Sequence, residues 1–222
     1  MPTTNCLLAA FTSSLVIAVA SPASAGADVS STPLKDCYLS ASSGHTEPVD
    51  VQASGFTPGA LVEVTMAGEA LTPVVADANG AVSMRAEAPF RRGGERSFAV
   101  RFAEQGNENN VLKLKSRVSA ISVALRPPRA DPKRKVKWIG RGFTERKAVY
   151  AHYLLNDEVR KTVRVARPHG ACGTFTARRR QFPFRPEVGD WIVQIDQQRR
   201  FSPTPASAAV RLTLAVQRVF AR

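Results

Sequence analysis

Val49-Asp50-Val51-Gln52-Ala53-Ser54-Gly55-Phe56-Thr57 is followed, after a gap of three residues, by Leu61-Val62-Glu63-Val64. The same pattern returns 87 positions further along, as Val136-Lys137-Trp138-Ile139-Gly140-Arg141-Gly142-Phe143-Thr144 and then Ala148-Val149-Tyr150-Ala151. Each copy is an alternating run that enters a Gly-Phe-Thr corner and continues as a second alternating run. An internal repeat of this kind predicts two copies of one small β module, each of roughly a hundred residues.

Apolar and polar residues alternate along both halves, in short runs bounded by Gly, Pro and Asn. About seven such runs for each half, without an amphipathic pattern of ten or more residues, favour β-sandwiches. The sequence therefore predicts an all-β protein of two tandem immunoglobulin-like β-sandwiches after a signal peptide. We expect the first module over residues 26–117 and the second over residues 118–222. In the repeated corner, Gly permits a sharp strand exit and Phe closes the end of the core.

Residues 1–25 have the layout of a secretory signal peptide. An apolar run from Leu7 to Ala20 is followed by Ser21-Pro22 and then by Ala23-Ser24-Ala25, a small-residue cleavage site before Gly26. The run is shorter than the roughly 20 apolar residues that span a bilayer. We expect a secreted protein that is extracellular or associated with the cell wall.

Charge is distributed unevenly along the chain. Residues 26–125 carry nine Lys and Arg against 11 Asp and Glu, whereas residues 126–222 carry 22 against seven. The net charges are −2 and +15, which together give the +13 of the whole chain. This asymmetry indicates an anionic partner for the second half. General solubility is the competing interpretation, since net charge governs association rather than fold.

Two cysteines remain after the signal peptide, Cys37 and Cys172. An even number in a secreted chain predicts one disulfide between them, with two unpaired thiols as the alternative.

The stretch Gly55-Phe56-Thr57-Pro58-Gly59-Ala60-Leu61-Val62, with the turn from Asp77 to Gly80, resembles bacterial immunoglobulin-like modules of secreted actinobacterial proteins. The second half resembles uncharacterised secreted proteins of the same bacteria, through Gly142-Phe143-Thr144, Val149–Tyr153, Cys172-Gly173 and the Gly189-x-Trp191 motif. The resemblance covers most of residues 36–222 and implies a fold and a compartment, but no activity.

A second resemblance bears on catalysis. His152, followed by Pro168-His169-Gly170-Ala171-Cys172, is similar to the His and Ser/Thr-His-Gly-Cys pattern of the L,D-transpeptidases. Pro168 replaces the hydroxyl residue and Ala171 separates the Gly from the Cys, which would displace a nucleophilic thiol by about 3.5 Å. His169 and Cys172 have a spacing found in zinc sites, but a second ligand pair is missing. No cofactor motif or metal site is expected.

The residues expected to contact an anionic ligand combine an aromatic face with nearby cations, because guanidinium groups suit phosphate and carboxylate. Alternation places Tyr150, His152 and Leu154 on the outward face of one strand. The full candidate set is Tyr150, His152, Arg160, Arg164, Arg178, Arg179, Arg180, Arg199 and Arg200. The expected partner is an anionic cell-wall polymer or a membrane surface, and nucleic acid is not expected. The alternatives are a peptidoglycan-modifying Cys enzyme and a purely structural protein-interaction module.

Overall fold

The computed structural model describes residues 28–42, 44–206 and 208–218. Every regular element in these ranges is a β-strand, so the predicted all-β class is confirmed. The predicted signal peptide lies outside the described residues. The strands are β1 (Ser30–Ser31), β2 (Tyr38–Ser42), β3 (His45–Thr46), β4 (Pro48–Ser54), β5 (Leu61–Met66), β6 (Glu69–Ala70), β7 (Val74–Val75), β8 (Val82–Glu87), β9 (Glu95–Glu104), β10 (Val111–Ala120), β11 (Ser122–Arg126), β12 (Lys135–Arg141), β13 (Val149–Leu155), β14 (Glu158–Ala166), β15 (Phe175–Arg180), β16 (Gly189–Asp196) and β17 (Val210–Val216).

The first half of the chain forms two sheets. One has the strand order β1-β4-β8, and the other has the order β3-β2-β10-β9-β5-β6, with β7 paired to β5. Buried residues alternate along β4 and β5, as the sequence predicts for strands with one covered face. All pairings in this half are antiparallel except that of β2 with β10, which is parallel.

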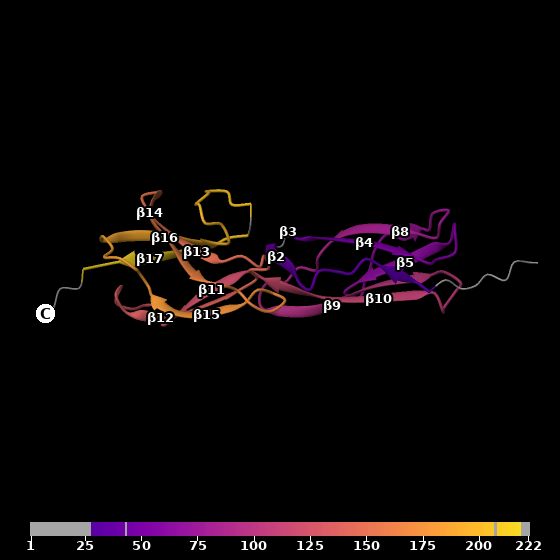
Figure 1. Ribbon diagram of the computed structural model, residues 1–222, viewed down its shortest axis with the longest axis horizontal. Helices are drawn as coiled ribbons and strands as arrows, with labels where there is room; N and C mark the ends of the chain where they lie inside the picture. The colour runs from indigo at the N-terminus through magenta and orange to yellow at the C-terminus, as the bar shows by residue number, and fades with distance from the viewer. Residues whose placement is uncertain (1–27, 43, 207, 219–222) are drawn as a thin grey trace, which may run out of the picture.

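The second half repeats the arrangement with fewer strands. Its sheets have the orders β11-β12-β15 and β14-β13-β16-β17, and all their pairings are antiparallel. Figure 1 shows the strands of the first half at one end of an elongated molecule and those of the second half at the other.

The buried apolar side chains fall into two clusters. One contains buried residues between Tyr38 and Val118, with Phe102 and several valines fully covered. The other contains buried residues between Val123 and Leu214, and Trp138 and Trp191 are its largest side chains. Because β10 ends at Ala120 and β11 begins at Ser122, the chain passes from one cluster to the other through Ile121 alone. The boundary expected between residues 117 and 118 falls within β10.

The repeated corner has the same geometry in both halves. Gly55 and Gly142 take positive φ values of 100° and 81°, and a Cβ atom on either would lie within 3.0 Å of backbone atoms. The phenylalanines that follow, Phe56 and Phe143, are 3% and 1% exposed. Glycine therefore allows the close turn, and the aromatic ring closes the end of each core.

Cys37 and Cys172 form a disulfide that links the two halves of the chain, with their Cα atoms 5.1 Å apart. Both residues are buried. The predicted pairing is therefore confirmed. It joins the segment before β2 to the turn before β15, across 135 positions of sequence.

The described part of the chain contains no helix that is long and apolar enough to cross a membrane.

Candidate anion-binding site

The sheet formed by β11, β12 and β15 has one apolar face and one basic face. Val123, Leu125, Val136, Trp138 and Phe175 turn toward the core and are buried. Because side chains alternate along a strand, the residues between them turn outward. Along β12, Val136, Trp138 and Gly140 are buried, and Lys135 and Lys137 are exposed.

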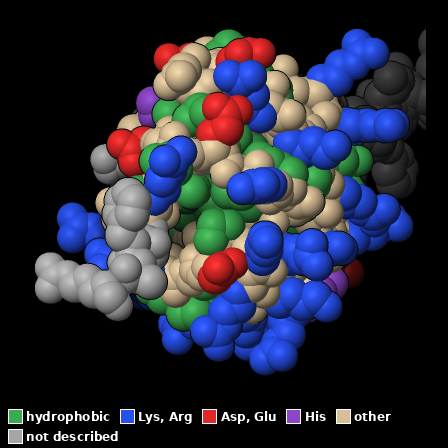
Figure 2. Space-filling view, turned by 90° about the vertical axis from the view of Figure 1, so that its left-hand side faces the viewer, with side chains coloured by type: hydrophobic (Ala, Val, Ile, Leu, Met, Phe, Trp, Pro, Cys, Tyr) green, Lys and Arg blue, Asp and Glu red, His purple; other side chains and the backbone are tan. Residues whose placement is uncertain are grey.

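Five outward cations are brought together by the register of these strands. We call them the basic face: Arg126, Lys135, Lys137, Arg178 and Arg180. Lys137 lies directly between Arg126 and Arg178 on the neighbouring strands, and Lys135 lies directly opposite Arg180. All five are exposed. Figure 2 shows Lys and Arg crowded along the lower part of this end of the molecule, where Figure 1 places β12 and β15.

No carboxylate balances the basic face. The seven Asp and Glu of residues 126–222 all lie outside β11, β12 and β15. Among the described residues, none of the five cations is part of an ion pair. Directly opposite side chains in an antiparallel pair have Cβ atoms only about 5 Å apart, and like charges there destabilise the sheet. An anion placed between opposite cations would remove that repulsion.

The consecutive arginines of β15 divide between the two faces. Arg178 and Arg180 belong to the basic face, whereas Arg179 lies opposite the buried Val136. The Nε atom of Arg179 donates a hydrogen bond of 2.8 Å to the backbone oxygen of Val165. Its guanidinium therefore connects β15 to β14 at the side of the sandwich.

The other predicted candidates lie on the opposite sheet or beyond it. Tyr150 is half-buried and lies directly opposite Arg164, which is exposed. Arg160 is at a register shift between β13 and β14 and contacts Glu158 at 3.3 Å. Arg199 and Arg200 are exposed in the segment after β16. The candidates thus do not form one surface.

His152 was expected on an outward face, and the structure corrects this. Its side chain is fully buried, and Leu154 on the same face is 6% exposed. The reason is the segment 198–203, which follows β16 and returns over the outer face of the sheet. The ring of Phe201 lies 5.7 Å from that of His152, and the backbone oxygen of Gln198 lies 3.1 Å from His152 Nε2. His152 is therefore not available to a ligand in this structure.

Sequence reasoning also missed the polar row to which His152 belongs. Thr162, His152, Gln194 and Arg211 lie side by side on β14, β13, β16 and β17, in direct cross-strand register. Thr162 Oγ1 lies 2.9 Å from His152 Nδ1, and Arg211 Nε donates to Gln194 Oε1 at 3.0 Å. The covering segment completes the row, because Gln194 Nε2 donates to the backbone oxygen of Ser202 at 2.9 Å.

Asp196 holds this row together at its buried end. Its carboxylate accepts hydrogen bonds from Gln194 Nε2 at 2.9 Å and from the backbone amide of Gln198 at 2.8 Å, and it lies 3.2 Å from His152 Nε2. Burial alone would raise the pKa of the Asp196 carboxyl, but these hydrogen bonds outweigh it and hold the pKa below its ordinary value. The side-chain polar atoms of His152, Gln194 and Asp196 all have partners within the protein, so the row is a structural element that fixes the covering segment.

The residues considered for catalysis are not arranged for it. Cys172 is disulfide-bonded and 2% exposed, so it offers no free thiolate in this structure. Within the ranges that the structure describes, no group of three or more His, Cys, Asp or Glu side chains could hold a metal ion.

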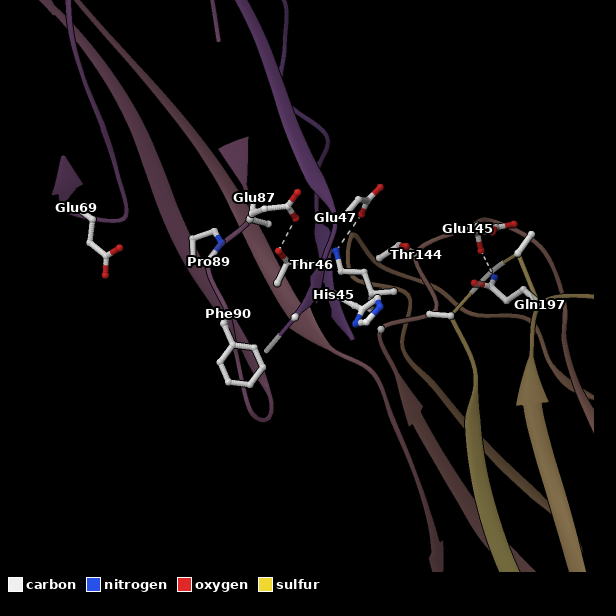
Figure 3. Close-up of a pocket in the computed structure, with 16 residues that line it drawn as sticks. His45, Thr46, Glu47, Glu69, Glu87, Pro89, Phe90, Thr144, Glu145 and Gln197 are labelled. Carbon is white, nitrogen blue, oxygen red and sulfur yellow. Dashed lines mark hydrogen bonds between the residues drawn. The ribbon is translucent and has the colours of Figure 1, made fainter. Parts of the chain in front are cut away.

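A cleft of about 780 Å³ lies between the two halves, next to β3. Figure 3 shows Glu47, Glu87 and Glu145 around it, with Phe90 at one side. Glu87 accepts a hydrogen bond of 2.7 Å from the Thr46 hydroxyl, and Glu47 pairs with Lys35. Because carboxylates line its walls, this cleft does not suit an anion.

No protein-family model matches this chain, and no curated protein matches it either. The solved structures that it resembles include three that each align with 85% of it. They are the ligand-binding domain of human OSCAR (12% identity, 96% of that chain, TM-score 0.33), fibronectin(III)-like modules of Clostridium thermocellum CbhA (11%, 94%, 0.28) and a tandem of titin immunoglobulin domains (9%, 95%, 0.31). TM-scores of this size carry no argument about fold or function.

Proposed function

We propose that this chain is a secreted or cell-envelope-associated, non-enzymatic binding protein of two tandem immunoglobulin-like β-sandwiches that meet at Ile121. Its second module contacts an anionic envelope polymer. The two apolar clusters and the matching corners at Gly55 and Gly142 support the tandem arrangement. The disulfide supports an oxidising compartment, because such bonds persist mainly outside the cytosol.

One observation carries the binding function. Five exposed cations face the same way on three neighbouring strands, and no carboxylate lies on those strands. Mutual repulsion makes this arrangement unfavourable for the isolated protein, so it fits a surface that works with bound anions. The first half has a net charge of −2, and its smaller group of outward cations, Arg101, Lys113, Lys115 and Arg117 on β9 and β10, is partly balanced by Glu95, which pairs with Arg117 at 3.0 Å.

The test is retention of the chain 26–222 on purified cell walls at two salt concentrations. The Debye length falls from about 10 Å at 0.1 M salt to about 3 Å at 1 M, so binding through exposed charges should be strong at the first and lost at the second. Retention that persists at 1 M, or no retention at 0.1 M, contradicts the proposal. A basic protein of similar net charge but unrelated fold serves as the control for general charge attraction.

A structural protein-interaction module is the second candidate. It is favoured by the disulfide and by the short passage through Ile121, which both restrict movement between the halves. The same wall experiment distinguishes the candidates, because a purely structural module predicts no salt-sensitive retention.

A further inference from the structure

We propose that the basic face binds a linear polymer through two neighbouring phosphodiester groups, with the polymer running along the strands. This inference rests on the proposed function and deepens it, since it identifies the surface and the chemical class of the ligand. The first subsite lies between Lys135 and Arg180, and the second lies between Lys137 and Arg178, flanked by Arg126.

The composition of each cross-strand pair points to phosphate. Each pair joins one ammonium group to one guanidinium group on the next strand. A tetrahedral phosphodiester has two non-bridging oxygens that point in different directions. It can therefore accept from a guanidinium on one strand and from an ammonium on the other. A planar carboxylate keeps lone pairs that can accept from the ammonium, but they lie in one plane and favour bidentate contact with the guanidinium fork, so it matches a pair split between two strands less well.

The spacing of the pairs points to a polymer. Lys135 and Lys137 are two residues apart on β12, so the two subsites are about 6.8 Å apart along the strand direction. Two single phosphate ions in these subsites would each lose translational freedom on binding, and they would repel one another. Two groups of one chain occupy both after a single loss of translational freedom, which is the advantage of a multivalent ligand.

A lipid surface fits less well. Proteins that lie on membranes usually combine cations with large apolar side chains that enter the acyl boundary. The exposed large apolar residues of the described chain, Leu61, Val75, Phe90, Val111 and Val188, all lie outside β11, β12 and β15. The basic face is thus a polar surface suited to a soluble chain.

Two charge-matched variants of the chain 26–222 test the site. The face variant replaces all five cations with Gln, and the control variant makes the same change at five exposed cations outside both the basic face and the candidate set, Arg92, Arg96, Lys161, Arg167 and Arg218. The probes are a synthetic oligomer of glycerol phosphate, poly-L-glutamate of equal charge, and vesicles containing phosphatidylglycerol. Binding is measured at 0.1 M salt by fluorescence anisotropy for the polymers and by co-sedimentation for the vesicles.

We expect the unmodified chain to bind the glycerol phosphate oligomer more tightly than the other two probes. The face variant should lose roughly tenfold or more in affinity for it, because several charge-assisted hydrogen bonds are removed, whereas the control variant should change by less than about twofold. Equal losses in the two variants, or binding of poly-L-glutamate as tight as that of the oligomer, would overturn the inference. Preferential binding of vesicles would assign the face to lipid instead.

Two double variants provide the test if the face variant does not fold, as judged by circular dichroism. Lys135→Gln with Arg180→Gln removes one subsite, and Lys137→Gln with Arg178→Gln removes the other, so each should weaken oligomer binding in part. Unchanged affinity in both refutes the inference. Salt-sensitive retention of the face variant on walls at the level of the unmodified chain also refutes it, but leaves the proposed function standing. Absence of retention by every form refutes the proposed function itself.

Discussion

The backbone amide of Phe143 donates a hydrogen bond of 3.1 Å to the carbonyl oxygen of Gly173, as that of Phe56 does to Gly80. A Cβ atom at position 173 would lie 1.9 Å from the Phe143 carbonyl oxygen, and Gly173 has a φ of +59°. The turn before β15 is thereby held against the corner that closes the second core. Only glycine permits this approach in both halves, because any side chain would collide with the backbone.

Gly173→Ala is expected to lower the free energy of unfolding by about 2–4 kcal/mol, since it adds a backbone collision to the cost of positive φ. Urea denaturation measures the change. Gly170→Ala is the matched control, because Gly170 has a φ of +71° but nothing within 4 Å of its Cβ position. Gly170→Ala should lower the free energy of unfolding by only about 1 kcal/mol. Equal losses for the two variants would contradict the role assigned to the Phe143 contact.

Replacement of Cys37 and Cys172 by Ser should lower the free energy of unfolding by about 5 kcal/mol in the chain-entropy model, because the bond closes a loop of 135 residues. Denaturation of the chain 26–222 with and without reductant measures the same quantity. Detection of two free thiols in protein purified from culture supernatant would refute the disulfide.

Lys137→Glu should stabilise the protein while it weakens polymer binding. The new carboxylate would lie directly opposite Arg126 and Arg178, which turns two repulsive pairs into attractive ones worth about 0.2–1 kcal/mol each at low salt. The gain should disappear at 1 M salt. Lys133→Glu, at an exposed position outside the sheet, makes the same change in net charge and should leave stability nearly unaltered. A destabilised Lys137→Glu variant would show that the basic face is not under repulsion.

Asp196→Asn should destabilise the protein most at neutral pH. The folded-state pKa of Asp196 is depressed, so the carboxylate contributes stability above the unfolded-state pKa, about 3.9 for Asp, and loses it as the pH falls through the folded-state value. The difference in unfolding free energy between the two proteins should therefore shrink below about pH 4. Asp190→Asn, at an exposed position of β16, is the control. A difference that does not change with pH would contradict the account.

Protein recovered from the culture medium of a secreting host should begin at Gly26. The small-residue motif Ala23-Ser24-Ala25 is the expected cleavage site. N-terminal sequencing measures this, and an intact Met1 in all recovered protein would refute the signal peptide.

The strands, the Gly-Phe-Thr corners and the division of charge are all readable in the sequence, because each depends on neighbouring residues. Alternation over a few positions places Val136 and Trp138 inside and Lys135 and Lys137 outside. A chain that is expected outside the cell and has two cysteines can form only one internal disulfide, and the structure contains that disulfide.

Burial of His152 depended on the tertiary structure. Alternation alone turns His152 outward, but the segment 198–203 covers that face, because Gln194 and Arg211 donate to its backbone oxygens. The sequence alone likewise does not show which residues flank Lys137 on the adjacent strands. Arg126 and Arg178 are 52 positions apart and flank the same side chain only because β11 and β15 pair with opposite edges of β12. Strand order and register are long-range properties, so the basic face exists only in the folded chain.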